Sequence, residues 1–257
     1  MTGHVSEFSI LLESQDICFA IGSISFTRIY NRLIICFLCS TENFKLSTRD
    51  LVGLQLWRGA FLLGDYICSH IDSFKDQVIL ELAAGTGFSS IIASKFARKV
   101  ICTDLDSIIP LIKTNFQQNS SNNLNAEFLI KSLDFFKPNW KREFEDHLKE
   151  IDIILVADVI YNPEITRAFF ETLTYLLTNT LKPIKVLISM EKRWWTNNQG
   201  QVHAPSYDHF IDHLNELQVN QHCKPKIQNV PIQTFKHHFS QYYTRNDDLI
   251  LFQVTKE

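Results

Sequence analysis

The sequence lacks the excess of basic residues that proteins use to hold long nucleic acids through their phosphates. Its 25 lysines and arginines face 28 aspartates and glutamates over 257 residues, which gives a formal net charge of −3. Neutralisation of phosphate charge supplies most of the sequence-independent affinity for nucleic acids. We therefore expect no direct nucleic-acid binding by the chain.

The sequence also lacks a hydrophobic run long enough to cross a membrane. Its most apolar stretch, residues 21–40, is interrupted by Arg28, Asn31 and Arg32, whereas a spanning helix needs about 20 apolar residues in succession. A charged start, an apolar centre and a small-residue cleavage site do not occur in the order of a secretion signal. These absences predict a soluble intracellular protein with no membrane partner.

Cysteine is present, but without the regular spacing of a disulfide framework. The six cysteines are scattered, and the Cys36–Cys39 pair, with its Cys-x-x-Cys spacing, lies in an apolar run without a second pair after it. The nine histidines show no spacing that would complete a zinc site. We expect buried reduced thiols, a reducing compartment and no metal.

The chain divides into two parts by pattern. Residues 1–50 are rich in β-branched and aromatic side chains, which predicts a β-rich extension with short strands at residues 8–12 and within 21–37, the latter forming a hairpin. From residue 51 to 257 strands alternate with helices, and neither repeats nor low-complexity tracts occur. We predict one main domain over 51–257.

The main domain has the pattern of an α/β fold with a mainly parallel sheet. Asn162 is the predicted N-cap of a helix that opens at Pro163, and the polar residues 137–149 are predicted to form an insertion. The other predicted elements are strands at residues 78–82, 99–103, 126–131, 151–157, 184–189 and 249–254, and helices at 53–71, 89–97, 107–118 and 207–217.

Several predicted strands end in residues suited to ligand binding, which in such sheets occurs at the carboxyl ends of the strands. Gly85 and Gly87 lie between a strand and a helix, where the backbone can approach a ligand closely. Asp104 follows Gly85 by 19 residues (104 − 85 = 19), and a carboxylate there can accept hydrogen bonds from ribose hydroxyls. NAD is therefore one candidate ligand. Glu81, however, would oppose a pyrophosphate and suits a cofactor that carries an ammonium and a sulfonium.

Three stretches resemble the motifs of seven-β-strand methyltransferases: ELAAGTG at residues 81–87, Thr103-Asp104, and DVIY at residues 158–161. In that family, Asp-x-x-Tyr after the fourth strand is typical of the subgroup that methylates non-histone proteins, mostly on lysine. VGLQLWRGA at residues 52–60 and SMEKR at 189–193 resemble a nuclear member of the subgroup whose substrate is the nucleic-acid-binding protein Kin. The resemblance covers roughly residues 51–257. It implies a Rossmann-like, seven-stranded, mainly parallel sheet with helices on both faces.

The resemblance also implies an activity and a set of site residues. The cofactor would be S-adenosylmethionine, and the acceptor a lysine of a protein, with Asp158 and Tyr161 facing the incoming nitrogen. The location would be the nucleus, and also the cytoplasm, with a monomer favoured. The implied cofactor-binding residues are Trp57, Glu81, Ala83, Gly85, Gly87, Asp104, Asp134, Phe135 and Ala157.

Two positions depart from the family pattern. Ala83 stands where the family usually has its first glycine, and Phe135 replaces a tryptophan common in relatives. We expect these changes to weaken cofactor binding at most. Taken alone, Asp158 is also explained as a strand-end carboxylate that caps a turn, and Tyr161 as a packed aromatic.

The sequence leaves other functions open. The acceptor can be a small molecule or another side chain, and the fold can also serve as an inactive binding module. Trp194-Trp195 follows Lys192-Arg193. These residues are candidates for gripping a substrate peptide, although an interface or a packed loop explains the tryptophans equally well.

Overall fold

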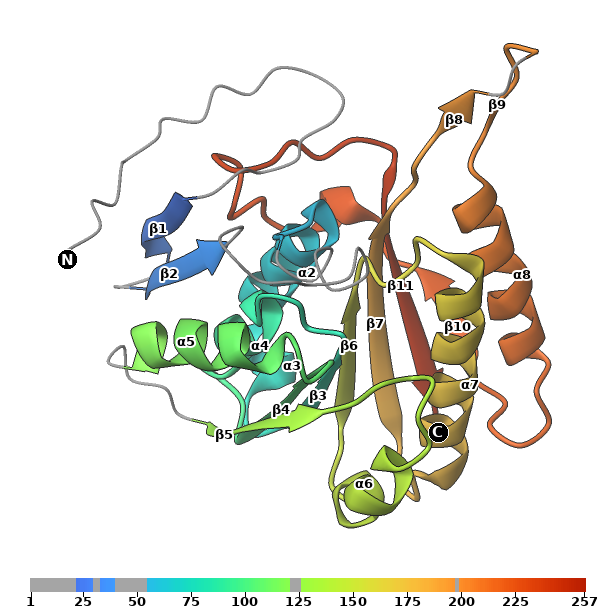
Figure 1. Cartoon of the computed structure of the whole chain (residues 1–257), viewed down its shortest axis with the longest axis horizontal. Coiled ribbons are helices and arrows are strands. Elements are labelled where there is room, and N and C mark those ends of the chain that lie inside the picture. The colour runs from blue at the N-terminus through green and yellow to red at the C-terminus, as the bar shows by residue number, and fades with distance from the viewer. Residues whose placement is uncertain (1–21, 30–32, 40–54, 121–125, 197–198) are drawn as a thin grey trace.

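The computed structural model of the chain describes residues 22–29, 33–39, 55–120, 126–196 and 199–257. Its main feature is a seven-stranded sheet in the order β10-β11-β7-β6-β3-β4-β5 (Figure 1). The strands of this sheet are β3 (Val78–Leu82), β4 (Lys99–Asp104), β5 (Glu127–Ser132), β6 (Ile153–Ala157), β7 (Ile184–Glu191), β10 (Lys226–Asn229) and β11 (Leu249–Lys256).

The sheet is parallel from β5 to β7, and β11 and β10 are added in antiparallel fashion at one side. The chain runs outward from β3 through β4 to β5 and then returns to β6 on the other side of β3. Strand order thus reverses between β3 and β6, and such switch points are where open α/β sheets bind ligands. The predicted Rossmann-like, mainly parallel sheet is confirmed.

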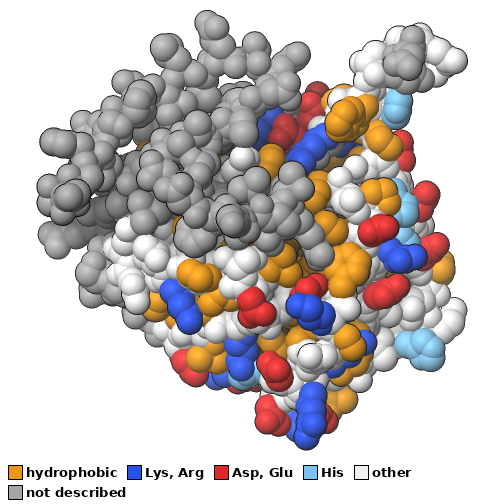
Figure 2. Space-filling view, viewed as in Figure 1, with side chains coloured by type: hydrophobic (Ala, Val, Ile, Leu, Met, Phe, Trp, Pro, Cys, Tyr) orange, Lys and Arg blue, Asp and Glu red, His pale blue; other side chains and the backbone are white. Residues whose placement is uncertain are grey.

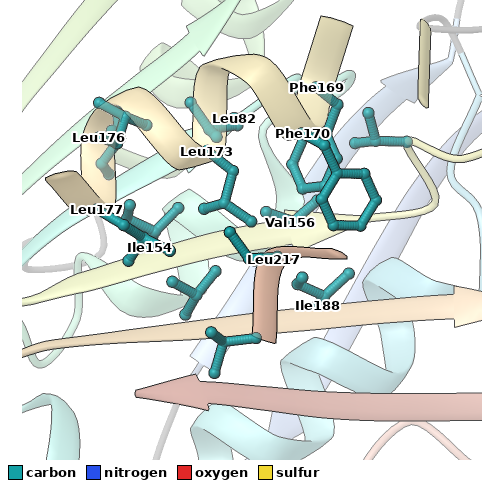
Figure 3. Close-up of a cluster of buried hydrophobic side chains, with 14 of the residues drawn as sticks. Leu82, Ile154, Val156, Phe169, Phe170, Leu173, Leu176, Leu177, Ile188 and Leu217 are labelled. Carbon is teal, nitrogen blue, oxygen red and sulfur yellow. The ribbon is translucent and has the colours of Figure 1, made fainter. Parts of the chain in front are cut away.

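Helices cover both faces of the sheet because the strands alternate their side chains between two cores. Leu80 and Leu82 of β3 pack with α6 (Trp140–Leu148), α7 (Pro163–Asn179) and α8 (Pro205–Gln218). Figure 3 shows part of this core, with side chains of α7 above those of β6 and β7. Ile79 packs on the opposite face with α2 (Arg58–Ser69) and α4 (Phe88–Ala93). Burial on both faces explains why these strands are continuous apolar runs.

Helix α7 begins as predicted. The Asn162 side-chain oxygen accepts hydrogen bonds from the backbone amides of Glu164 at 2.8 Å and Ile165 at 3.3 Å. Pro163 occupies the first turn, where its missing N–H costs no hydrogen bond. This cap fixes the point at which the chain leaves β6 and turns over the sheet.

Two segments differ from the sequence prediction. Residues 137–149, predicted as a polar insertion, contain helix α6, whose Trp140, Phe144 and Leu148 are buried at four-residue spacing. The helix predicted at residues 53–71 is shorter, because Trp57 is extended (φ −89°, ψ 157°) and α2 begins at Arg58. The extended Trp57 projects from the start of α2 rather than from within it.

Outside the main sheet, β1 (Gly22–Ile29) and β2 (Leu33–Cys39) form the predicted hairpin, and β2 lies against α5 (Ile109–Ser120). The strand predicted at residues 8–12 lies outside the described residues. The remaining elements are α3 (Ile71–Phe74), the short ribbon of β8 (Trp195–Thr196) and β9 (Val202–His203), and the 3₁₀ helix η1 (Ile232–Thr234).

Two sequence expectations can be compared directly with the described part of the chain. Cys68, Cys102 and Cys223 are buried free thiols, as predicted for these three. Among the helices in the described ranges, none combines the length and the apolar character that a membrane span requires.

Candidate active site

A pocket opens at the carboxyl ends of β3, β4 and β6, at the point where the strand order reverses. About 790 Å³ of space free of protein atoms lies in and in front of it, open solvent included. Two carboxylates line it, and no described residue of its wall is Lys, Arg or His. The lining residues are Gln55, Leu56, Trp57, Ala60, Ala83, Ala84, Gly85, Thr86, Asp104, Leu105, Ile108, Leu133, Phe135, Ala157, Asp158, Val159, Tyr161 and Ile165.

The loop after β3 forms one wall of the pocket through an unusual backbone path. Ala83, Gly85 and Gly87 all have positive φ, at 50°, 55° and 80°, a region that side chains other than glycine rarely adopt. Ala83 adopts it nonetheless, and it lines the pocket. A Cβ at Gly87 would lie 3.3 Å from the Ile112 side chain. Gly87 does not line the pocket; it starts α4.

Asp104 lies at the end of β4 and holds this loop in place. One of its carboxylate oxygens accepts a hydrogen bond from the Gly85 amide at 2.6 Å, and the other accepts one from the Leu105 amide at 2.7 Å. The residue is 6% exposed and lines the pocket. Because its carboxylate both lines the pocket and bonds the loop, Asp104 connects the position of the loop to the ligand site.

Glu81 is buried beneath the loop and is not part of the pocket wall. Its carboxylate accepts a hydrogen bond from the Ser90 amide in the first turn of α4, at 2.8 Å. Burial raises the pKa of Glu81 to about 7, although hydrogen bonding from Ser90 opposes the rise. The structure therefore shows Glu81 joining β3 to the start of α4, and a direct contact of Glu81 with the cofactor stays a prediction.

Two neighbouring residues predicted around an adenine differ in their positions. Phe135 lines the pocket, and its ring packs edge-on against Phe169 with centroids 6.0 Å apart. Asp134 is not in the pocket wall. Its carboxylate accepts the Phe136 amide at 3.0 Å and lies 3.5 Å from the Lys137 ammonium. A direct contact of Asp134 with an adenine amino group stays a prediction.

Asp158 lines the pocket at the end of β6, with a positive φ of 51° and 8% exposure. Its two carboxylate oxygens accept hydrogen bonds from the Gly59 amide at 2.5 Å and the Glu191 amide at 3.0 Å. Burial raises the pKa of Asp158, while the positive charges of Arg193 and Arg58 and the two backbone amides act in the opposite direction. The carboxylate thus connects the start of α2 to the end of β7.

The backbone of Gly59 is held at both its N–H and its carbonyl group. Its carbonyl oxygen accepts a hydrogen bond from the Ser189 hydroxyl of β7 at 2.8 Å, while its amide donates to Asp158. A Cβ at position 59 would lie 2.4 Å from the Asp158 carboxylate. The absence of a side chain at Gly59 is therefore what allows this approach. The sequence analysis did not single out Gly59 or the Ser189 hydroxyl, whose roles depend on contacts across more than 90 residues.

Trp57 and Tyr161 line the pocket and are both half-buried, and we call the part of the wall that they form the mouth. The Arg193 guanidinium lies over the Trp57 ring, 4.5 Å from its centroid, while Arg58 forms an ion pair with Glu191. Within the described ranges, no group of three or more His, Cys, Asp and Glu side chains could hold a metal ion.

The sheet order and the pocket at its switch point define a Rossmann-like methyltransferase fold. A protein from Streptococcus mutans described as a SAM-dependent methyltransferase matches 90% of this chain and 55% of its own, with a TM-score of 0.53 at 14% identity. A second solved methyltransferase, complexed with SAH, matches 95% of this chain and 58% of its own, with a TM-score of 0.53 at 15% identity. At these identities the likeness concerns the fold.

The chain belongs to the lysine methyltransferase family, whose model matches residues 41–216. It is similar to methyltransferase-like protein 22 of Mus musculus, with 34% identity over 182 residues, or 65% of this chain and 46% of the relative. The Homo sapiens protein of the same name is 35% identical over 182 residues, or 65% and 45%. Protein-lysine methyltransferase METTL21E of Mus musculus is 28% identical over 138 residues, or 51% and 54%. The chain thus spans less than half the length of the two methyltransferase-like protein 22 sequences.

Proposed function

We propose that this chain transfers a methyl group from S-adenosylmethionine to a lysine of a protein. The observation that carries the proposal is the pocket at the switch point. It is lined by Asp104 and Asp158 and by no described basic side chain, in a chain of the lysine methyltransferase family. Such a wall favours a ligand and an acceptor that both carry positive charge.

The residues present fit this cofactor. The Asp104 carboxylate lines the pocket at the end of β4, where ribose hydroxyls can donate to it, and Leu105, Ile108 and Phe135 offer apolar surface for an adenine. The pyrophosphate of NAD would find no described cationic side chain in the wall and would face two carboxylates. When bound, S-adenosylmethionine supplies a methyl group on a positively charged sulfur.

The acceptor nitrogen must be neutral to attack the methyl carbon, and the pocket residues affect this in two opposing ways. An unperturbed lysine has a pKa of about 10.4, so the amine is scarce at neutral pH. The apolar wall near Trp57 and Tyr161 disfavours the ammonium, whereas Asp158 favours it. Asp158 therefore serves to attract and orient the side chain, and the loss of water around the lysine in the pocket disfavours its charged form. Proximity then supplies much of the rate.

The finer parts of the proposal rest on the motif resemblance. They are a substrate that is a nucleic-acid-binding protein similar to Kin, a nuclear location and a monomeric state. The 34–35% identity to methyltransferase-like protein 22 supports the choice of subgroup. We also retain the division at residue 50, with the main domain carrying the pocket, as part of the proposal.

The decisive experiment incubates the protein with labelled S-adenosylmethionine and a cell extract, and then maps the labelled residue. Label on a lysine of a protein supports the proposal. Label on another side chain or on a small molecule moves the acceptor to that class. Calorimetric titration with the cofactor separates an enzyme from an inactive binding module, and the absence of both binding and transfer would refute the proposal.

A further inference from the structure

The segment that follows β7 places two cations on aromatic rings at the mouth of the pocket. Arg193 lies over Trp57, with 4.5 Å from guanidinium to ring centroid. The Lys192 ammonium lies 4.2 Å from the ring centroid of Tyr207 and 5.8 Å from that of Trp194. Because Trp57 lines the pocket, these stacked side chains continue the pocket wall outward along the protein surface.

These two cations keep their charge at the mouth. The neighbouring Arg58 is neutralised by Glu191. The carboxylate of Asp248 accepts hydrogen bonds from the Trp194 indole N–H at 2.7 Å and from the Asn246 amide group at 3.1 Å. In the part of the chain that the structure describes, no ion pair joins Lys192 or Arg193 to a carboxylate. Arg193 also acts electrostatically on the Asp158 and Glu191 carboxylates, so this edge carries charges of both signs, with Lys192 and Arg193 as cations outside an ion pair.

Exposed apolar side chains lie next to the two cations. Trp194 is 53% exposed, Trp195 62% and Val202 62%, and the last two belong to the β8–β9 ribbon. Figure 2 shows hydrophobic and basic side chains side by side near the base of this ribbon. Aromatic residues together with arginine are the types that most often carry the binding energy of protein interfaces.

We propose that Lys192, Arg193, Trp194 and Trp195 form a recognition surface for an acidic segment next to the target lysine of the substrate protein. This inference rests on the proposed function and names the substrate's chemistry. Asp158 attracts the target lysine into the pocket, and Lys192 and Arg193 then lie next to the residues that flank that lysine. Neighbouring Asp or Glu side chains bind these two cations, while the tryptophans cover apolar parts of the same segment.

A nucleic acid fits the same surface less well. Two cations would neutralise few phosphates, and the chain carries a net charge of −3. An acidic peptide needs only a local match of charge, which the surface provides.

Two fluorescent peptides test the inference on the full chain. Each has the same length and one lysine, flanked by glutamates in the first peptide and by glutamines in the second. Fluorescence anisotropy without cofactor should give a dissociation constant about tenfold lower for the glutamate peptide at low salt. Because the two cations are near the surface, the preference should shrink when salt is raised to about 1 M.

Matched variants connect this preference to the surface. The double variant Lys192→Gln/Arg193→Gln should lose it, whereas Lys192→Arg/Arg193→Lys, which preserves both charges, should keep most of it. Lys75→Gln is the control, because Lys75 is an exposed cation that precedes β3 and lies at the end of the strand opposite the pocket. Melting temperatures identify any variant that fails to fold. If the double glutamine variant fails, the peptide preference of the charge-preserving variant tests the inference.

Equal binding of the two peptides, or an unchanged preference in the folded double glutamine variant, would overturn the inference. Tighter binding of a single-stranded oligonucleotide of equal charge would overturn it in favour of nucleic acid. Failure here differs from failure of the proposed function. If lysine is labelled in the extract but the two peptides bind equally, only the inference of an acidic segment fails. If the glutamate peptide is preferred but no lysine is labelled, the proposed methyl transfer to lysine fails.

Discussion

The Asp158 carboxylate at the end of β6 accepts a hydrogen bond from the backbone amide of Gly59 at the start of α2, at 2.5 Å. The two residues are 99 positions apart in the sequence. Their contact joins the strand end at the pocket to the segment that carries Trp57. A residue whose motif suggests a role toward the incoming nitrogen therefore also fixes the shape of the pocket mouth.

Asp158→Ala should reduce both stability and methyl transfer. If Asp158 only oriented the acceptor, the free energy of unfolding would not change. Its removal, however, leaves the buried amides of Gly59 and Glu191 without an acceptor, at about 1–3 kcal/mol for each unsatisfied group. Thermal unfolding, cofactor calorimetry and transfer rate should be measured on the same preparation.

Asp158→Asn is the matched control, because its side-chain oxygen can satisfy one of the two amides. It should recover part of the stability while transfer stays low. Full transfer in either variant would remove Asp158 from the acceptor side of the site.

Gly59→Ala should destabilise the protein even though alanine is the better helix former by about 1 kcal/mol. The added Cβ would lie 2.4 Å from the Asp158 carboxylate oxygen, and this carboxylate is held by a second hydrogen bond to Glu191. The clash should therefore displace α2 and weaken cofactor binding through Trp57. A double-mutant cycle checks the cause. In an Asp158→Ala background the same substitution should cost much less, and an equal cost in both backgrounds would contradict this explanation.

Asp104→Ala should weaken binding of S-adenosylmethionine by about 1–3 kcal/mol, or about 5- to 150-fold in the dissociation constant. It removes the expected acceptor for the ribose and the partner of the Gly85 amide. Calorimetry measures the constant. Asp104→Asn should have a smaller effect on loop stability because it retains an acceptor oxygen, and wild-type affinity in both variants would place the ribose elsewhere.

Glu81 should make stability fall as pH rises through the weakly acidic range. Burial raises the pKa of Glu81 from its ordinary value of 4.5 to about 7 in the folded protein, so the folded state binds the proton more tightly than the unfolded chain. Proton binding by Glu81 adds roughly 3 kcal/mol to the free energy of unfolding below about pH 4.5, and this stabilisation is lost as the pH rises to about 7. The difference in unfolding free energy between wild type and Glu81→Gln should follow this curve. A flat difference would show that the buried carboxylate does not titrate there.

The regular part of the fold could be predicted because burial on both faces leaves a direct trace in the sequence. The five residues of β3 are all buried, and the prediction of a strand at 78–82 is confirmed to the residue. Helix α6 could not be recognised as easily. Its apolar side chains, Trp140, Phe144 and Leu148, recur only every fourth residue within a polar segment, so composition alone suggests an insertion.

The sequence could predict those site residues that lie at the ends of strands. Asp104, Asp158 and the loop at Ala83 and Gly85 all line one pocket, because parallel strands bring their carboxyl ends to the same edge. The sequence could not show that Glu81 is directed toward Ser90 beneath the loop. The spacing of residues in the sequence does not predict tertiary contacts of this kind.

The pairing of β7 with β11 has a consequence for the order in which the sheet can be completed. Every residue from Ile184 to Glu191 has a partner in β11, from Lys256 back to Leu249. During synthesis β7 emerges 58 residues ahead of its partner (249 − 191 = 58). In that interval its apolar edge can pair with other chains. The strand β7, whose Glu191 amide holds Asp158 in the pocket wall, is thus open to misassembly at one edge while the polypeptide is being made.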